Sequence, residues 1–250
     1  MLALVRREFT SYFVSPVGYI VAGLLVPAVS LIAFLPPLSQ GSAISMAPVY
    51  DWVVYFSVFV APLLTMGLLA EERRSGTLEL LLTSPVRDWE LVVGKWLGAM
   101  AFFVAVTAFL LPFVVVLVHY QSTNQVIAVG GLSLSIGNLD LGATISGYLG
   151  VLLVAAAMLG IGVLTSSLTR NQLVAAFVGF LLGLVLSVVA VGASFLPAQL
   201  FAFSQYLAIY AHFETFNQGR VTVRDVVYFL ALTIGALFLA TRVLESRRWR

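Results

Sequence analysis

The sequence predicts an all-α integral membrane protein with six transmembrane helices. Hydrophobic residues make up 61% of the 250 residues and charged residues only 10%, which leaves too few polar side chains to cover a soluble globule. Apolar runs of about 20 residues, the length that crosses the hydrocarbon of a bilayer, recur along the chain. Most of the 13 Lys and Arg residues fall in clusters near the ends of these runs.

Composition also excludes several kinds of site. The chain has no cysteine, so disulfides and thiolate metal sites are excluded. A net charge of +2, with no large basic face, argues against nucleic-acid binding. No phosphate-binding loop of the form G-x-x-x-x-G-K-[ST] is present, because Gly94-Lys95 is followed by Trp96. We therefore expect neither a cofactor nor a metal in this chain.

The pattern of apolar and polar residues in the first segment, residues 1–16, predicts an amphipathic helix. Its apolar face is formed by Leu2, Val5, Phe9, Tyr12 and Phe13, with Arg7, Glu8 and Ser11 opposite. This pattern favours a helix that lies in the membrane interface, with aromatic rings at headgroup depth and arginines toward anionic lipid. A soluble amphipathic helix packed on another subunit is the alternative.

Six spans follow, within a single transmembrane domain of residues 1–250. They are predicted at residues 18–35, 52–69, 96–118, 142–164, 173–191 and 226–241. Pro27 should kink the first span, and Pro36-Pro37 should end it. None of these ranges carries an ionisable side chain well inside it, which argues against an ion-coupled carrier.

The basic residues set the expected orientation. Eleven of the 13 Lys and Arg residues fall on one side: Arg6, Arg7, Arg73, Arg74, Arg87, Lys95, Arg170, Arg242, Arg247, Arg248 and Arg250. Only Arg220 and Arg224 fall on the other side. Because positive charge marks the cytoplasmic side, we expect a protein of the inner or plasma membrane with both termini in the cytoplasm.

The central segment, residues 71–95, is charged and lies between two long apolar runs. Arg73 and Arg74 fall where the preceding helix should end, and Gly76 suits a left-handed cap. A short helix is then predicted from Thr77 until Pro85, with the next long helix capped by Asp88. In this short helix one face is apolar and carries Leu78, Leu81 and Leu82, whereas Glu79 and Thr83 lie opposite.

The run E-x-x-x-G-T-L-E-L-L-L-T-S-P, from Glu72 to Pro85, resembles the hallmark of the membrane subunits of type-2 ATP-binding-cassette (ABC-2) transporters. In that family the segment is a cytoplasmic coupling helix that docks on a separate ATPase subunit. The resemblance implies ATPase contacts by Glu72, Gly76, Thr77, Leu78, Glu79, Leu81, Leu82 and Pro85. A generic cytoplasmic loop is the alternative.

Two further stretches extend the likeness. The opening REFTSYFVSPVGYI and the late HFETFNQGRVTVRDVVYF resemble the permeases of the gliding-motility export group. The resemblance implies an exporter working by alternating access, in which a partner ATPase subunit binds ATP and Mg. Besides the lipid membrane, it implies a second permease subunit, identical or related, and an auxiliary exterior membrane-anchored protein. A scaffolding membrane component of a motility or secretion machine, which moves no substrate, is the competing interpretation.

The remaining candidates concern packing and cargo. Small residues recur every fourth position, in the rows Gly142, Ser146, Gly150 and Gly179, Gly183, Ser187, and predict close helix contacts within one subunit or between two. A candidate substrate path is lined by Tyr55, Phe56, Phe59, Phe177 and Phe180, with lipid-facing or packed aromatics as the alternative.

An enzymatic alternative would be a membrane serine protease, with Ser146 as nucleophile and His212 as base.

The segment 193–225 has two open interpretations. Its apolar stretch at 200–210 is too short to cross a bilayer, and Asn217-Gln218-Gly219 predicts a turn. It is either a plain exterior loop or a pair of re-entrant helices, and the family resemblance favours the second. Thr222 is expected to cap a helix that starts near Val223.

Overall fold

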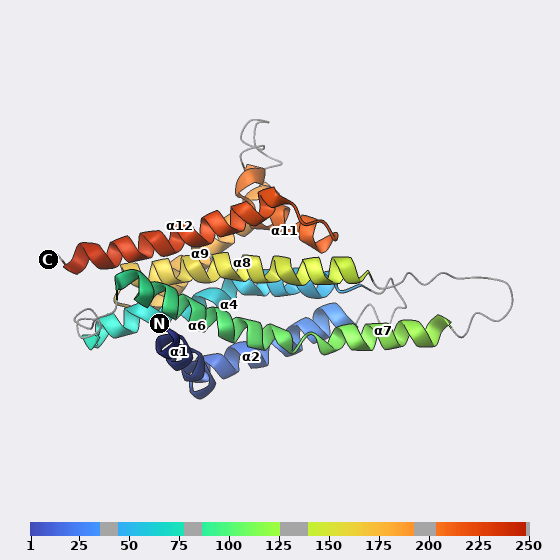
Figure 1. Cartoon of the computed structure of the whole chain (residues 1–250), viewed down its shortest axis with the longest axis horizontal. Coiled ribbons are helices and arrows are strands. Elements are labelled where there is room, and N and C mark those ends of the chain that lie inside the picture. Colours follow the sequence, from blue (N-terminus) through green and yellow to red (C-terminus); the bar gives the residue numbers. More distant parts are fainter. Residues whose placement is uncertain (36–44, 78–86, 126–139, 193–203, 249–250) are drawn as a thin grey trace.

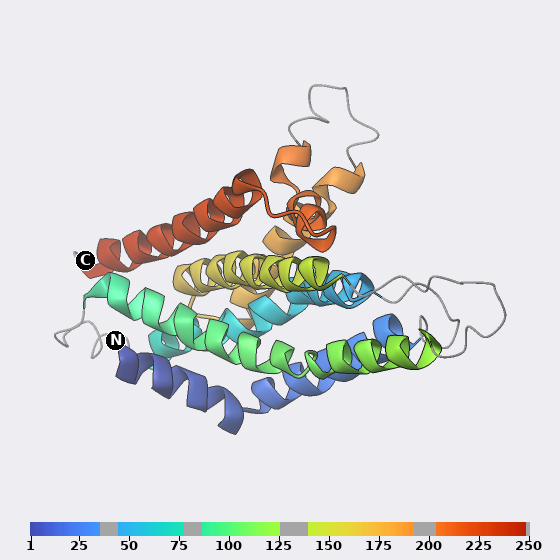
Figure 2. The same cartoon turned by 45° about the vertical axis from the view of Figure 1, so that its right-hand side comes forward.

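A computed structural model describes residues 1–35, 45–77, 87–125, 140–192 and 204–248. These residues form a bundle in which most of the long helices run roughly along one common axis (Figures 1 and 2). The elements are α1 (Leu2–Val14), α2 (Pro16–Val29) continued by the π-helical turn η1 (Ser30–Phe34), α4 (Ala47–Arg74), α6 (Asp88–Ala108), α7 (Pro112–Gln125), α8 (Leu141–Leu168), α9 (Gln172–Gly192), α11 (Ile209–Asn217) and α12 (Val223–Arg248). Strands are absent from the described ranges.

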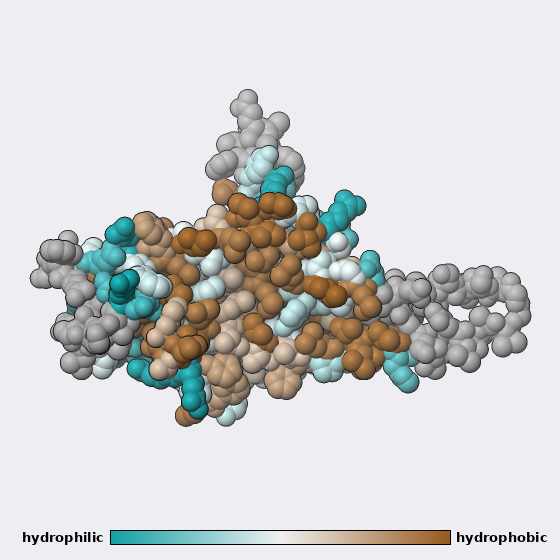
Figure 3. Space-filling model, viewed as in Figure 1, coloured by the Kyte–Doolittle hydropathy of each residue, from teal (hydrophilic) through white to brown (hydrophobic). Residues whose placement is uncertain are grey.

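Six segments are long and apolar enough to cross a membrane, which confirms the predicted number of spans. They are Pro16–Ala33, Ala47–Arg74, Asp88–His119, Leu141–Leu168, Gln172–Val189 and Val223–Ser246. Apolar side chains form a band over the middle of the face shown in Figure 3, with hydrophilic side chains mainly toward its ends. The molecule is therefore a multi-pass membrane protein.

Helices α4 and α8 form the centre of the bundle. They lie side by side in both views and are the two most buried spans (Figures 1 and 2). Close contact depends on glycines of α8: Gly147 faces the ring of Tyr50, and Gly162 faces Thr65. Small side chains let helix backbones approach in this way. Of the predicted rows, Gly150 faces Phe216 of α11, and Gly179 and Gly183 face Thr165 and Met158 of α8, so these members pack within the chain.

Alanine at Gly162 tests this packing. A Cβ there would overlap the Thr65 hydroxyl and lie 3.0 Å from Thr65 Cβ, and Thr65 is fully buried. We expect Gly162→Ala to destabilise the chain by about 1–3 kcal/mol, as overpacking does. The matched control is Gly235→Ala in α12, where a Cβ meets nothing within 4 Å and stability should be unchanged or higher. Melting in nanodiscs measures both, and equal melting temperatures would contradict the expectation.

The third span departs from the prediction of one continuous helix over 96–118. Helix α6 ends at Ala108, and α7 starts at Pro112 after a turn at 109–111. Proline lacks the backbone N–H and its ring clashes with the preceding turn, so Pro112 interrupts the helix. Pro27, in contrast, lies inside α2, which passes into the π-helical turn η1 three residues later.

Helix α1 is formed where expected, but its predicted polar face is wrong at Glu8. Glu8 and Tyr12 are buried against α6, whereas Leu2 and Phe13 are exposed. The reason is a buried cation on α6, Lys95, which draws the carboxylate inward. The helix is thus packed on its own chain.

Part of the segment 193–225 is helical. Helix α11 buries Ile209, His212, Phe213 and Phe216, and it packs mainly on α8. A plain loop is therefore wrong for 209–217, while residues 193–203 lie outside the described part of the chain. The turn at Gly219, with φ +82°, and the start of α12 at Val223 with Thr222 as its cap agree with the sequence.

Candidate functional site

The exit from α4 has the geometry that the sequence predicts. The helix ends at Arg74 with two basic residues in its last turn, and Gly76 follows with φ +76°. A side chain at this φ is strained, so the position favours glycine. Thr77 Oγ1 lies 2.9 Å from Ser75 Oγ and donates to the Glu72 carbonyl at 3.3 Å, which holds the turn against the helix end.

Most of the predicted short helix lies outside the described residues. This applies to Leu78, Glu79, Leu81, Leu82 and Pro85. The next described residue is Arg87, which caps α6. The backbone N–H of Arg87 donates to Glu90 Oε2 at 3.0 Å. The predicted cap at Asp88 is therefore wrong by one residue, because Glu90 reaches back three residues rather than two.

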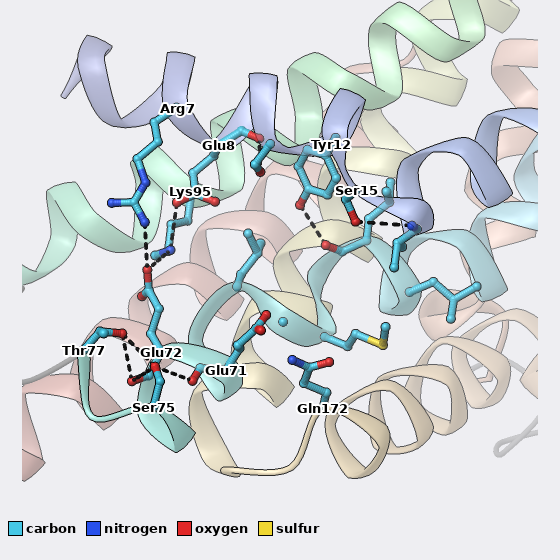
Figure 4. Close-up of a pocket in the computed structure, with 17 residues that line it drawn as sticks. Arg7, Glu8, Tyr12, Ser15, Glu71, Glu72, Ser75, Thr77, Lys95 and Gln172 are labelled. Atoms are coloured by element: carbon cyan, nitrogen blue, oxygen red, sulfur yellow. Dashed lines mark hydrogen bonds and ion pairs between the residues drawn. The ribbon is translucent and has the colours of Figure 1, made fainter.

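A buried group of charges, the Lys95 cluster, lies directly behind this turn. It consists of Arg7, Glu8, Glu72 and Lys95 (Figure 4). Lys95 Nζ on α6 donates to Glu8 Oε1 on α1 at 3.0 Å and to Glu72 Oε1 on α4 at 2.7 Å. Arg7 Nη2 lies 3.8 Å from Glu72 Oε1 at the exposed rim. The cluster joins three helices that are far apart in the sequence.

Charge balance makes this burial possible. The Lys95 side chain is only 1% exposed, and an unpaired ammonium in such a place would carry a large desolvation penalty. Two carboxylates compensate Lys95, and Arg7 brings the cluster to electrical neutrality. This site gives little signal in the sequence, because Lys95 falls just outside a predicted span and Glu8 falls on the predicted polar face of α1.

A second contact fastens α1 to α4. The Tyr12 hydroxyl donates to the Leu64 carbonyl at 2.7 Å. Burial raises the pKa of Tyr12 above its usual range, so the phenol stays protonated and remains a donor. Together with the Lys95 cluster, this bond fixes α1 along the last three turns of α4.

A cavity of about 370 Å³ opens beside these contacts. Its polar lining includes Tyr12, Glu71, Glu72, Ser75, Thr77 and Gln172 (Figure 4). Glu72 Oε2 is buried and has no hydrogen-bond partner among the described residues. In that part of the chain no three His, Asp or Glu side chains gather as a metal ion would require.

The chain is similar to a known family of membrane proteins. A family model described as ABC-2 family transporter protein matches residues 20–248. The chain belongs to the ABC-2 transporter family. A search of curated proteins gives no match. Membership makes the chain a membrane-spanning permease subunit of an ABC transporter, and it implies an ABC ATPase as partner.

The aromatic residues predicted to line a path in this ABC-2 permease are partly brought together. Phe59 of α4 and Phe180 of α9 have ring centroids 4.7 Å apart, and with Phe177 they line a shallow apolar hollow of about 260 Å³. Tyr55 stacks instead on Tyr210 of α11, at 5.2 Å. Phe56 contacts Trp52 on its own helix.

Polar contacts that the sequence did not reveal hold α11 to the permease bundle. Asp51 Oδ1 accepts from the Tyr210 hydroxyl at 3.0 Å and from Asn217 Nδ2 at 2.9 Å. The span-forming helices are longer than the predicted ranges and include Asp51, Lys95 and Asp225, each one residue before the predicted start of its span. Each of these three residues lies toward the end of its helix and borders a long apolar run, so hydropathy alone assigns it to a loop.

The serine protease alternative is not supported by the geometry. Ser146 Oγ donates to the Phe216 carbonyl at 2.8 Å. His212 Nδ1 lies 2.7 Å from Asp225 Oδ1, and Nε2 lies 3.1 Å from the Tyr206 carbonyl. Both ring nitrogens of His212 are thus bound to other groups, so among the described residues His212 is not paired with Ser146 as a general base would be.

Proposed function

We propose that this ABC-2 permease is the membrane subunit of an exporter, in which two permease subunits work on two ATPase subunits. The proposal rests mainly on the position of Glu72, the α4 member of the Lys95 cluster, which lies one helical turn before Gly76. A force on the segment after Gly76 acts on Glu72 and, through Lys95, on α1 and α6. The central segment is therefore well placed to relay closure of an ATPase to several spans.

We assign the end of the bundle that carries the central segment to the cytoplasm. Both chain termini and the end of α4 lie there (Figures 1 and 2). Arg6 and Arg7 are exposed at this end, together with Arg242 near the end of α12. Exposed Leu2 and Phe13 support an interfacial position for α1, with its other face bound to α6.

The proposed mechanism is alternating access. Closure of the ATPase subunits pushes the central segment and rocks the spans, which opens a path between the two permease subunits. The apolar hollow at Phe59, Phe177 and Phe180 supports a hydrophobic or lipid-like cargo, because no charged residue lines the hollow.

We propose that α11 is a re-entrant helix in the outer leaflet. One face of α11 is apolar, and hydrogen bonds from α11 to Asp51 hold this helix to α4.

A narrower assignment follows from the first and last thirds of the sequence. The stretches around Pro16 and Phe213 resemble the gliding-motility export group. We propose that subgroup, with a second permease subunit and an auxiliary exterior protein as partners. In the competing role, a scaffold without transport, addition of cargo would leave the ATP turnover of the assembled complex unchanged.

The orientation predicts a labelling pattern. Because the chain has no cysteine, single cysteines can be introduced without a background. Gln218, exposed after α11, should react with a membrane-impermeant thiol reagent added to intact cells. Ser75 and Ser246, exposed at the other end, should react only after the cells are opened. Labelling of Ser75 from outside would reverse the orientation and remove the proposed docking site from the ATPase.

The functional proposal is tested by reconstitution. The purified chain alone is expected to show neither ATP hydrolysis nor stabilisation by ATP, because it has no phosphate-binding loop. Addition of the cognate ABC ATPase subunit in nanodiscs should give a complex with cargo-stimulated hydrolysis. Saturable ATP binding by the isolated chain, or a failure to form the complex, would contradict the proposal.

A further inference from the structure

A single hydroxyl of α8 contacts the backbone of α4 at three atoms. Ser166 Oγ accepts from the backbone N–H groups of Leu69 and Ala70, both at 3.1 Å, and donates to the Met66 carbonyl at 3.0 Å. In an α-helix the N–H of residue 70 pairs with the carbonyl of residue 66. The hydroxyl thus binds both members of one helical hydrogen bond, and Ser166 itself is fully buried.

The contact, which spans Met66 to Ala70, overlaps the end of the weakest part of α4. Pro62 is inside the helix and lacks a backbone donor. The Thr65 hydroxyl donates back to the Ala61 carbonyl at 2.7 Å, a contact that favours bending. Gly67 follows, with the low helix propensity of glycine. Left alone, α4 would bend most easily between 62 and 67.

Further contacts extend the junction to either side. Gly162, one turn before Ser166, brings the α8 backbone against Thr65. Arg73 Nη1 reaches the Ser167 carbonyl at 3.4 Å, one turn closer to Gly76. Helix α4 is therefore held to α8 from its weak stretch to its end.

We propose that Ser166 is a positioning residue for coupling, which joins the cytoplasmic end of α4 to α8 so that the two move as one body. The inference rests on the proposed function for its purpose. A push on the central segment then tilts α8 together with α4. Without the junction, the bend at Pro62 would absorb the push and the outer parts of the spans would stay in place.

A distance measurement tests the junction directly. Spin labels are attached to cysteines at Glu71 in α4 and Ile145 in α8, both exposed. A helix rises about 1.5 Å per residue, which places the labels roughly 35 Å apart, within the range of pulsed electron paramagnetic resonance. The full chain is measured in nanodiscs with its ATPase subunit, without nucleotide and with trapped ATP.

The parent chain is expected to give one narrow distance distribution that is the same in both states. Ser166→Ala should broaden it about twofold even without nucleotide, because the bend at Pro62 is released. The matched control is Ser167→Ala, whose hydroxyl donates to Leu164 on its own helix, and this variant should resemble the parent. An unchanged distribution in Ser166→Ala, or a nucleotide-dependent shift in the parent chain, would overturn the inference.

Hydrogen exchange on the unsubstituted chain provides a second test, should Ser166→Ala fail to fold. The amides of Leu69 and Ala70 should exchange more slowly than those of the stretch 65–67, although they lie closer to the helix end. Equal or faster exchange would also overturn the junction. Neither measurement without nucleotide requires transport. A complex that fails to hydrolyse ATP would therefore refute the proposed function and leave the junction to be judged separately.

Discussion

Replacement of Lys95 by methionine is expected to destabilise the protein severely. The change would leave the carboxylates of Glu8 and Glu72 buried without the cation that each now binds, at 3.0 and 2.7 Å. Removal of one partner from a buried ion pair typically costs about 3–5 kcal/mol, because the remaining charge is uncompensated. Thermal melting of the purified chain in nanodiscs, together with the fraction that elutes as a single species, measures the effect.

Two controls separate the lost charge from the lost side chain. Arg242→Met removes an exposed pair with Glu245 and should cost less than about 1 kcal/mol. A triple variant that combines Lys95→Met with Glu8→Gln and Glu72→Gln removes every charge that Lys95 compensates, and it should recover most of the stability. If Lys95→Met melts like the parent chain, the Lys95 cluster does not hold the three helices together.

Leu81→Asp is expected to weaken docking of the ATPase subunit at least tenfold, or by about 1.4 kcal/mol. Leu78, Leu81 and Leu82 share the predicted apolar face, and each buried leucine contributes about 1.5–3 kcal/mol to such a contact. An aspartate there must lose its hydration on docking. The affinity between permease in nanodiscs and soluble ATPase subunit measures the effect.

Related changes should separate docking from coupling. Glu79→Arg should leave membrane insertion intact but impair the link between ATP turnover and transport, because a charge at the rim sets register more than affinity. Gly76→Val should act through the backbone, since a β-branched residue tolerates φ +76° poorly. Val221→Asp, an equally polar change at the opposite end of the bundle, should leave docking unchanged. Parental affinity in Leu81→Asp would contradict the assigned contact face.

The part of the fold that could be predicted from the sequence is the part encoded locally. Hydropathy over about 20 residues gave all six spans, because each helix satisfies its own backbone inside the bilayer. The left-handed conformation at Gly76 and the cap at Thr222 also followed from neighbouring residues. The break at Pro112 carried a local signal as well, which the length of the apolar run concealed.

What escaped prediction depends on contacts between distant residues. Lys95 and Glu8 are 87 positions apart, and Ser166 is about 100 positions from the backbone that it binds. No periodicity along one helix reveals such a pairing, because it depends on how the helices are arranged. Glu8 shows the consequence: its position on a polar face predicted exposure, whereas its partner on α6 makes it buried.

The central claim is that the segment after Gly76 docks on an ABC ATPase subunit, and site-specific photo-crosslinking tests it most directly. A photoreactive amino acid is placed at Glu79, at Leu82 or, as a control, at Gln218, and cells that express the whole transporter are irradiated. We expect an adduct with the ATPase subunit from positions 79 and 82 and none from 218. Adducts from 218 alone, or none with the ATPase from 79 and 82, would contradict it.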